Sequence, residues 1–386
     1  MSERPEDQRQ AHSSGIVSPA EPAPVRRSVE VEYWVVDDEG WLTEPGDLVE
    51  ASPGVEREFV APLLEIKTSP CTSTGELRTE LFDRLARVLR QATSQGKHLV
   101  PLATPVCEQS IENLPSERTE IQDRIIGENF DYVRHCAGTH IHVEQQPERA
   151  IDQLNTLIAL DPALALVNSS PYFEREYLAT GARSELYRWK AYETLPHQGQ
   201  LWPYVDDMEE WAQLLERRYG EFVTEAIVSG FDRERVEEHF EPESAVWTPV
   251  KLREEFSTVE WRSPDTTLPS QVIQLADDVS GIIEHLVDAD VHVAGTTGRI
   301  TDEEIILPEF DAVQEYVAAG IRAGLSSSSV RSYLERMGFD VSAYEPMSEV
   351  IGSEGDLTAS EARQLRLECA DRLEKDVRQR RALHSE

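Results

Sequence analysis

SVEVEYWVV, residues 28–36, is the stretch that decides the fold of this 386-residue chain. Acidic and β-branched residues alternate in it, and the acidic turn sequence DDEG, residues 37–40, follows. This pattern predicts a strand that runs into a turn. Side chains two residues apart on a strand share a face, so we expect Glu30 and Glu32 to point the same way.

Two carboxylates side by side inside a sheet are costly unless something neutralises their charge. A hard cation would do so, because Mg²⁺ prefers carboxylate oxygens and keeps waters that substrate phosphates replace. The alternative is that this face of the strand is simply exposed to water, as many acidic faces are. The pair alone does not decide between a metal site and a solvated face.

Three further strands with ionisable side chains are expected at Leu63–Thr68, Gly138–Glu144 and Thr258–Arg262. Glu65 interrupts the apolar run of the first strand, and Glu58 precedes that strand. On the other two strands, the pairs His140 with His142 and Glu260 with Arg262 each stand two residues apart and so share a face. Each has an ordinary alternative, which is an outward carboxylate, a core histidine pair or a surface ion pair. If the strands form one curved sheet with these faces inward, they line a funnel with carboxylates, imidazoles and arginines. Such a funnel can hold several divalent ions and clamp the β- and γ-phosphates of ATP.

The chain divides by composition into three parts. Residues 1–27 are rich in Pro, Ser and charge and lack an apolar period, so we expect a disordered tail. Residues 28–300 are expected to form the main body. Residues 301–386 are expected to form a helical segment packed on that body.

Helices are expected mainly late in the chain. Leucines at helical spacing predict a helix at 74–95, and apolar residues predict another at 150–166. From Leu268 onward the chain is expected to be helical, with helices at 271–286, 310–323, 329–337 and 359–383, whereas 168–205 are expected to be loop. Additional strands are expected at 98–103 and 245–252. This order indicates an α+β fold, with an antiparallel sheet and helices packed on its outer face.

The formal charge is −36, from 37 basic and 73 acidic residues, and only five of the basic residues are Lys. Acid excess with little Lys is typical of proteins that work in molar salt, where the Debye length is ~3 Å and acidic side chains barely repel one another. An acidic tail or a nucleic-acid mimic would give a similar total. However, 39% hydrophobic residues and seven Trp indicate a packed protein. We expect the high-salt cytoplasm of a halophile.

Several partners are not expected. Nucleic-acid binding needs a basic patch, and the basic clusters of this chain are short. No apolar run approaches the ~20 residues that span a bilayer, and the N-terminus lacks the apolar core of a signal peptide. We therefore expect a soluble cytoplasmic protein that binds small molecules. The sequence does not decide whether the chain forms a homo-oligomer.

In their order along the chain, these motifs resemble those of carboxylate–amine ligases of the glutamate–cysteine ligase type, which have a glutamine-synthetase-like fold. The resemblance covers roughly residues 28–290. It rests on five segments: SVEVEYWVVDDEG (28–40), EFVAPLLEIKTSPC (58–71), GTHIHV (138–143), ALALVNSSPYFEREYLATGARSELYR (163–188) and STVEWRSPDT (257–266).

The resemblance implies a role for each matching residue. The Mg²⁺ ions, or Mn²⁺ in their place, would be held by Glu30, Glu32, Glu58, Glu65, His140 and Glu260. Arg262 would contact phosphate or the developing acyl phosphate, and Arg188 the substrate carboxylate. Lys251, Arg253 and Ser184 would contribute to cofactor binding. The implied reaction is phosphorylation of a glutamate γ-carboxylate by ATP, followed by attack of an amine such as that of cysteine.

The chain departs from the family pattern at Ser28, Thr104, Glu144 and Lys251, where Gly, His, Gly and Arg are usual. The substitutions at Thr104, Glu144 and Lys251 together suggest that the acceptor amine has changed. A non-catalytic or altered-acceptor paralogue is therefore a second hypothesis. A third is a metal-dependent hydrolase with a His-x-His strand, but such enzymes usually place that pair near the start of the chain and recruit further histidines.

Overall fold

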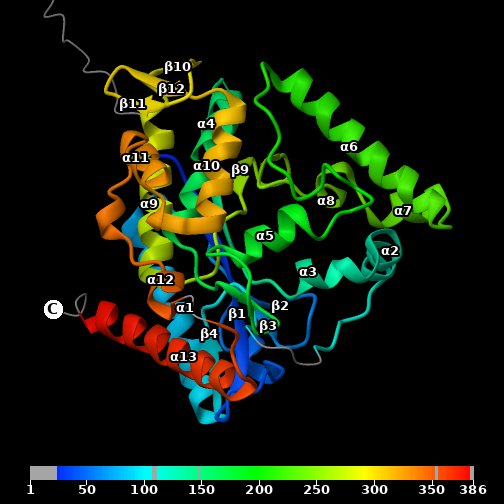
Figure 1. Cartoon of the computed structure of the whole chain (residues 1–386), viewed down its shortest axis with the longest axis vertical. Coiled ribbons are helices and arrows are strands. Elements are labelled where there is room, and N and C mark those ends of the chain that lie inside the picture. Colours follow the sequence, from blue (N-terminus) through cyan, green and yellow to red (C-terminus); the bar gives the residue numbers. More distant parts are fainter. Residues whose placement is uncertain (1–23, 107–110, 147, 353–354, 383–386) are drawn as a thin grey trace, which may run out of the picture.

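The computed structural model describes residues 24–106, 111–146, 148–352 and 355–382. These residues form a seven-stranded antiparallel sheet in the order β2-β3-β1-β5-β9-β8, with β4 paired to β1 (Figure 1). The strands are β1 (Arg27–Asp37), β2 (Val55–Arg57), β3 (Leu63–Lys67), β4 (Lys97–Val100), β5 (Thr139–Glu144), β8 (Val250–Arg253) and β9 (Thr258–Trp261). The predicted α+β class and the antiparallel sheet are confirmed. The expected curvature and funnel stay predictions.

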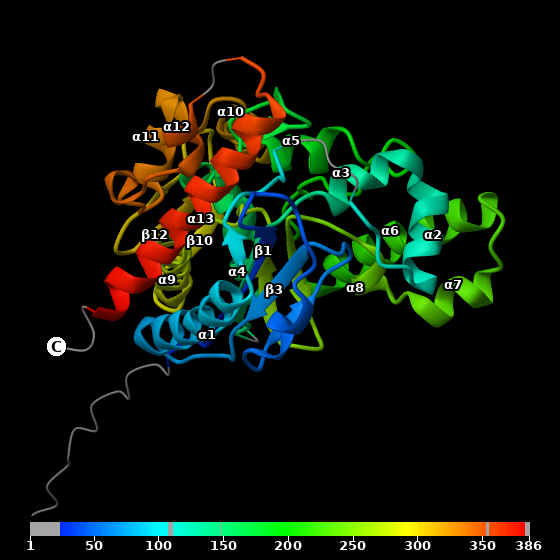
Figure 2. The ribbon, with the colours of Figure 1, turned by 90° about the horizontal axis from the view of Figure 1, so that it is seen from below.

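The central strand β1 has two different faces. Val29, Val31 and Tyr33 are fully buried, whereas Glu30 and Glu32 between them are half-buried. The apolar face packs in one core with three helices, α1 (Thr74–Ser94), α4 (Ala150–Leu160) and α9 (Pro269–His285). Figure 2 shows α1 and α9 on one side of β1 and β3. The alternation in the sequence therefore separates an apolar core face from a polar face.

The polar face of β1 ends at Trp34. This residue and Val36 continue the side of Glu30 and Glu32, but both are fully buried in a second apolar cluster with Cys369 and Ala370 of α13 (Ala359–Ala382). α13 also packs against α1, β4 and α9. The C-terminal helix thus covers the end of the face on which the ionisable groups lie.

Among the described residues, six further helices lie between residues 117 and 245, and one of them falls within 168–205, where loop was expected. They are α2 (Glu117–Ile126), α3 (Asp131–Arg134), α5 (Ala182–Trp189), α6 (Met208–Val228), α7 (Arg233–His239) and α8 (Pro242–Ala245). The prediction of loop throughout 168–205 is wrong, because α5 and the hairpin of β6 (Tyr172–Phe173) and β7 (Glu176–Tyr177) lie within it. α5 buries Ser184 and Arg188 beside Leu186, so it has no apolar period that would mark it.

The C-terminal part is not wholly helical. Residues 290–307 form a small sheet in which β12 (Glu304–Leu307) lies between β10 (Asp290–Val293) and β11 (Arg299–Ile300). The expected boundary between 300 and 301 therefore falls inside a sheet. β10 is mostly exposed, and its alternation (DVHV) spans only four residues, which explains why it was missed. The helices α10 (Phe310–Ala323), α11 (Ser328–Arg336), α12 (Met347–Ile351) and α13 complete this part.

Two other boundaries differ from the prediction. The α4 helix ends at Leu160 and continues as a 3₁₀ turn (Asp161–Leu166), because Pro162 has no N–H for a helical hydrogen bond. Val25 and Arg27 are buried, so residues 24–27 belong to the folded body. Residues 1–23 of the expected tail lie outside the described residues.

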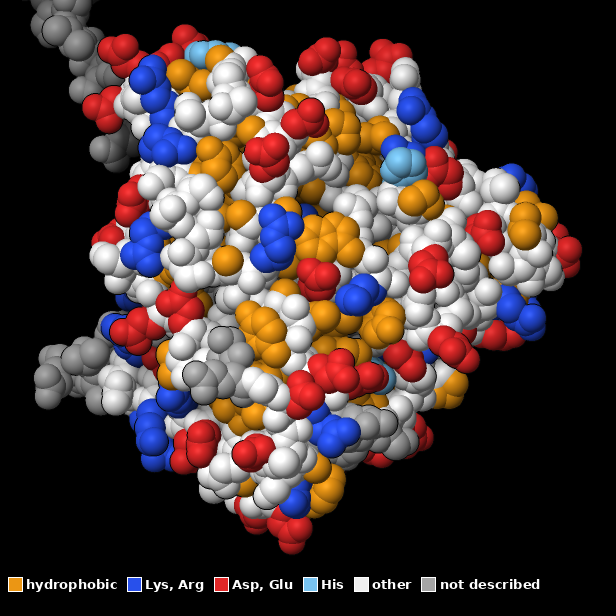
Figure 3. Space-filling view, viewed as in Figure 1, with side chains coloured by type: hydrophobic (Ala, Val, Ile, Leu, Met, Phe, Trp, Pro, Cys, Tyr) orange, Lys and Arg blue, Asp and Glu red, His pale blue; other side chains and the backbone are white. Residues whose placement is uncertain are grey.

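The surface is strongly acidic without a single dominant patch on the face seen in Figure 3, where Asp and Glu side chains are scattered among Lys and Arg. In the part of the chain that the structure describes, no helix combines the length and the apolarity that crossing a bilayer requires.

Candidate active site

The strand register gathers the ionisable side chains on one face of the sheet. Glu30 of β1 lies opposite Lys67 of β3 and opposite His140 of β5. Glu32 lies opposite Glu65, two residues further along the same strands. Directly opposed residues of an antiparallel pair point to the same face, so these groups form a continuous polar surface.

The same face continues across the next two strands. His142 of β5 lies opposite Glu260 of β9, and Glu260 lies opposite Lys251 of β8. His142 and Glu260 are buried, with 4% and 0% exposure. Four strands, β1, β3, β5 and β9, therefore present acids and imidazoles side by side, although β1 and β9 lie far apart in the sequence.

Among the described residues, three groups have ligand atoms that all lie within 4.8 Å of one another. They are Glu32–Glu58–Glu65, Glu30–Glu65–His140 and Glu30–His142–Glu260. Glu65 is shared by the first two groups and Glu30 by the last two, so the groups form a row. All six predicted ligands take part in this row. His142 also belongs to it, although only its neighbour His140 was predicted as a ligand.

The carboxylates at one end of the row are only partly compensated by positive charge. Burial raises the pKa of Glu65 to about 8, and the charges of Glu30 and Glu32 add to this effect. Burial and the neighbouring acids also raise the pKa of Glu58 well above its usual value. Such a cluster fits a hard divalent cation, which prefers oxygen ligands and would supply the missing positive charge.

One cation that the sequence analysis missed lies at this end of the row. The Nζ atom of Lys67 is 2.9 Å from Oε2 of Glu65 and 3.0 Å from Oε2 of Glu56. Lys67 stands two residues after Glu65 on β3, and this spacing is the signal that could have revealed it. Its single charge faces several carboxylates, so it does not neutralise the cluster.

The other end of the row is compensated by the protein itself. Nη1 of Arg253 is 3.0 Å from Oε2 of Glu260, and Arg262 also bonds to this carboxylate. Although burial opposes ionisation, the charges of Arg262 and Lys251 hold the pKa of Glu260 well below its usual value. Lys251 is 4% exposed, and burial lowers its pKa to about 7. This end is built to hold an ionised carboxylate in the core.

Glu30 links the two ends. Its Oε2 lies 3.0 Å from Nδ1 of His140 and 3.7 Å from Nε2 of His142. Burial favours the neutral acid, but hydrogen bonding to these two imidazoles and their charge lower the pKa of Glu30 below its usual value. An ionised carboxylate therefore lies between two histidines in the middle of the row.

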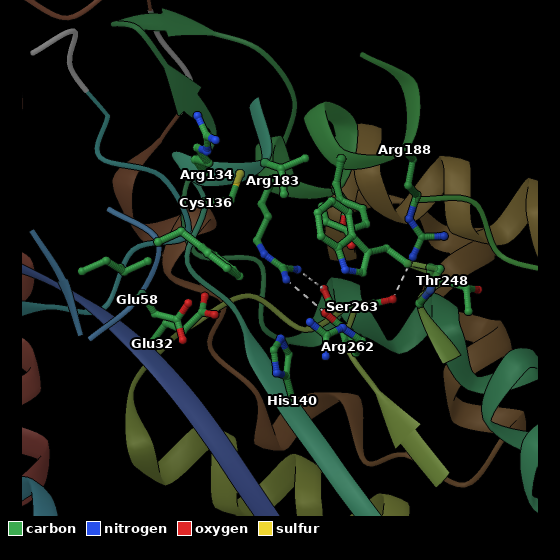
Figure 4. Close-up of a pocket in the computed structure, with 17 residues that line it drawn as sticks. Glu32, Glu58, Arg134, Cys136, His140, Arg183, Arg188, Thr248, Arg262 and Ser263 are labelled. Atoms are coloured by element: carbon green, nitrogen blue, oxygen red, sulfur yellow. Dashed lines mark hydrogen bonds between the residues drawn. The ribbon is translucent and has the colours of Figure 1, made fainter. Parts of the chain in front are cut away.

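A cavity lies beside the row (Figure 4). The sheet contributes Glu32, His140 and Arg262 to its lining, and the covering segments contribute residues of α3, α5 and 247–249. The side chains of Tyr187 and Trp247 form an aromatic part of the wall. Ligands can therefore reach the row from a partly apolar space.

Of the five residues predicted for catalysis and cofactor binding, three line this cavity and two do not. Arg262, Arg188 and Ser184 belong to its lining. Lys251 and Arg253 lie at the far end of the row beside Glu260, and Arg253 lines a separate surface cavity with residues of α6, α8 and the β8–β9 turn. Of the residues expected to bind the cofactor, Ser184 therefore lies at the cavity, whereas Lys251 and Arg253 lie beside Glu260.

The charge of Arg188 is already matched inside the protein. Its Nη2 donates to Oδ2 of the buried Asp161 at 2.7 Å and to Oγ of Ser263 at 2.8 Å. The other oxygen of Asp161 accepts a hydrogen bond from Nε1 of Trp261 at 2.9 Å. Binding of a substrate carboxylate by Arg188 stays a prediction, and Asp161 competes with it.

Two of the departures from the family pattern lie away from the row and the cavity. Thr104 is fully buried and shares a hydrogen bond of 2.7 Å with Ser170. Glu144 pairs with Arg26 at the partly exposed start of β1. Ser28, by contrast, lies opposite His142 in the β1–β5 ladder. Thr104 and Glu144 therefore have structural explanations of their own.

A family model for glutamate–cysteine ligase family 2 matches residues 28–336. No curated protein sequence matches the chain significantly. Among solved structures, a bifunctional glutathione synthetase from Pasteurella multocida is similar, with a TM-score of 0.57 and 15% identity over 92% of this chain and 52% of that one. This chain spans about half the length of that enzyme.

A second similar structure is a glutamate–cysteine ligase from Francisella tularensis in complex with AMP, with a TM-score of 0.55 and 12% identity over 93% of this chain and 90% of that one. At these identities the two likenesses establish the fold alone. A glutamine synthase homologue has a TM-score of 0.39 at 10% identity, over 89% of this chain and 70% of that one. That score is too low to support a statement about the fold, so the glutamine-synthetase-like architecture stays a prediction.

Proposed function

This chain belongs to glutamate–cysteine ligase family 2, and from that premise we propose that it is an ATP- and Mg²⁺-dependent ligase that joins a glutamate γ-carboxylate to an amine. The observation that carries the proposal is the row of three ligand groups beside a cavity. The solved ligase from Francisella tularensis, which holds AMP, supports a nucleotide as the second ligand.

The proposed chemistry proceeds in two steps. The γ-phosphoryl group of ATP passes to an oxygen of the glutamate γ-carboxylate, which releases ADP and gives an acyl phosphate. The amine nitrogen then attacks the carbonyl carbon, phosphate leaves, and the nitrogen loses a proton. Phosphorylation is needed because a free carboxylate is a poor acyl donor.

The residues of this chain divide the work by position. The seven acids and imidazoles of the row would hold Mg²⁺, whose charge stabilises the phosphoryl group during transfer. Arg262 lines the cavity and bonds to Glu260 of the row, so its guanidinium would bind a phosphate oxygen at their junction. Tyr187 and Trp247 would exclude water from the acyl phosphate.

The ligand set favours this proposal over a His-x-His hydrolase. Each of the three groups contains two or three carboxylates and at most one imidazole. Carboxylate-rich sites suit Mg²⁺, whereas zinc sites recruit histidine or cysteine. Elsewhere in the described chain, His98 bonds to Asp38 and His285 to a backbone oxygen of Thr301. The completeness of the row also speaks against a non-catalytic paralogue.

The deciding experiment incubates the full chain with ATP, Mg²⁺ and glutamate in molar KCl, varies the amine, and follows ADP release and product mass. The proposal expects ADP release that needs both glutamate and an amine. A matched reaction with Glu32→Gln, which removes one ligand of the row, should release none. Absence of glutamate-dependent ADP release with every amine tested, at saturating Mg²⁺, would overturn the proposal.

A further inference from the structure

The strand β10 has one free edge. Because β12 lies between β10 and β11, β10 pairs with a neighbour on one side only, as far as the described residues go. The backbone N–H of Asp290 donates to the oxygen of Glu303 at 3.1 Å, and that of Ala294 donates to the oxygen of Leu307 at 2.9 Å. Asp290 and Ala294 therefore direct their N–H groups toward the β12 side. Figure 1 shows this small sheet at one end of the molecule.

Two valines of β10 direct their backbone groups the other way. The N–H and C=O groups of successive strand residues point to alternate sides of the strand, so those of Val291 and Val293 point away from β12. Within the described ranges, no hydrogen bond uses the N–H or C=O of either valine. A row of unpaired backbone groups of this kind is a template for pairing with another strand.

The usual protections of an exposed edge are absent from β10. Its sequence, DVHV, contains no Pro or Lys, and Val293 is 47% exposed. The opposite edge strand, β11, is two residues long and carries the ion pair of Arg299 with Glu304. The edge strand β2 of the main sheet exposes Glu56 and Arg57. Of these three edges, β10 is therefore the least protected against another chain.

The side chains of β10 divide between two faces. Val291 packs against the main hydrophobic core, and Val293 continues the same face beyond that core. Asp290 and His292 lie on the other face, and both are exposed. The free edge is thus flanked by apolar side chains on one face and by a carboxylate and an imidazole on the other.

We propose that β10 pairs with β10 of a second copy of this chain, antiparallel and about a two-fold axis. The free backbone groups fix the register, because Val291 of each copy must lie opposite Val293 of the other. This pairing uses every outward N–H and C=O group of the two valines in both copies. It joins the two small sheets into one continuous sheet.

The edge is complementary to itself, which is why the occupant is a second copy. In the proposed register the exposed Val293 of one copy is covered by Val291 of the other, so the apolar faces meet. On the opposite face, Asp290 lies diagonally across from His292 of the other copy, within reach of an ion pair or hydrogen bond. His292 itself lies at the two-fold axis.

The first test is the oligomeric state of the full chain. A four-residue strand pair buries little surface, so we expect a weak dimer with a Kd of roughly 10 µM or above. Sedimentation in molar KCl, over a hundredfold concentration range, should show monomer converting to dimer. At low KCl the Kd should rise severalfold, because two copies that each carry a charge of −36 repel each other more. A chain that stays monomeric throughout in molar KCl would overturn the proposal.

Substitutions at the edge locate the contact. Val293→Pro removes an outward N–H and leaves the hydrogen bonds to β12 in place, so the dimer should be lost while the Tm of the dilute protein changes little. Val293→Lys should raise the Kd about tenfold, and it replaces the proline variant if that does not fold. Val350→Lys is the matched control, because Val350 is 50% exposed on α12, which Figure 1 shows far from β10. Equal dimerisation of wild type and Val293→Lys would contradict the proposal.

A disulfide tests the register. Across the two-fold axis the Cα atoms of residue 292 in the two copies would lie ~4.5 Å apart, which a disulfide can span. His292→Cys should therefore form covalent dimers under mild oxidation in molar KCl. Asp290→Cys should not, because the two copies of residue 290 would lie ~14 Å apart. Cross-linking that is equal in the two variants, or absent from both, would show that β10 does not pair with itself in this way.

Discussion

Glu30 on β1 and His140 on β5 face each other across the ladder, with Oε2 of Glu30 3.0 Å from Nδ1 of His140. The same alternation buries Val29 and Val31 on the opposite side of the strand. A slip of one residue would place both carboxylates of β1 in the apolar core. The hydrophobic pattern that sets the register therefore also assembles the site.

Substitution of single ligands should distinguish the carboxylates that only bind metal from those that also stabilise the fold. Glu65→Gln and Glu260→Gln should each abolish ATP turnover, because each removes a ligand of the row. Glu65→Gln should change the Tm without Mg²⁺ little near pH 7, because the raised pKa already keeps the Glu65 carboxyl neutral there. Glu260→Gln should lower the Tm by several degrees, because breaking a buried ion pair costs about 3–5 kcal/mol.

Melting curves and ADP release of both variants test this contrast. Glu56→Gln is the matched control, because Glu56 is exposed and lies opposite Glu65 on β2 but belongs to none of the three groups. It should retain turnover. Full activity of Glu65→Gln or Glu260→Gln at saturating Mg²⁺ would show that the metal assignment is wrong.

The raised pKa of Glu65 predicts a pH dependence with a definite sign. The folded carboxyl keeps its proton up to about pH 8, whereas the ordinary value is 4.5. Between these values the folded state binds more protons, so the free energy of unfolding of the metal-free chain should fall as pH rises. Mg²⁺ must displace that proton, so its apparent affinity should rise up to ~10-fold per pH unit in this window.

Thermal melts from about pH 5 to 8, with chelator and with Mg²⁺, measure both effects. The informative quantity is the difference in the pH slope of stability between wild type and Glu65→Gln. The comparison is needed because Lys251 has a pKa lowered to about 7, so its titration raises stability with pH above that value. Identical pH slopes of the two metal-free proteins would contradict the assignment of a buried, protonated Glu65.

The parts of the site that were predicted from the residues alone depend mainly on local spacing, whereas the role of Arg188 was predicted from the family resemblance. Glu30 with Glu32, and His140 with His142, stand two apart, and a strand period places each pair on one face whatever the rest of the fold does. The pairing of Arg188 with Asp161, and the hydrogen bonds of Arg183 to the backbone oxygens of Arg262 and Ser263, depend on where α5 packs against the sheet. No sequence period encodes that docking, which is why the role of Arg188 was predicted without its partner.

The acidic surface predicts salt-dependent stability. A charge of −36 spread over the surface repels itself at low ionic strength, and salt screens that repulsion. We expect the Tm to rise as KCl increases into the molar range, as it would for a protein of a salty cytoplasm. Melts at several KCl concentrations, with choline chloride as a control for the cation, check this. A Tm that stays flat or falls would remove the basis for the halophilic assignment.

Lys251 allows a test of whether the acceptor amine has changed. Its substitution for Arg suggested a changed acceptor when grouped with Thr104 and Glu144, but Thr104 lies in the core and Glu144 at the end of β5, paired with Arg26. Lys251 itself lies at the Glu260 end of the row, 4.0 Å from that carboxylate, and its Nζ donates to the backbone oxygen of Glu243 at 3.0 Å. It is not part of the cavity lining that contains Arg183.

We therefore expect Lys251→Arg to change KM for ATP and leave the order of amine preference unaltered. The larger guanidinium must also fit a site that is 4% exposed, so the Tm should fall. The measurement is an amine profile over cysteine, other amino acids and small amines, taken with wild type, Lys251→Arg and the control Arg253→Lys from the same strand. A reordered amine profile in Lys251→Arg, with KM for ATP unchanged, would instead place the second substrate beside Glu260. It would also restore the view that the substitution arose with a new acceptor.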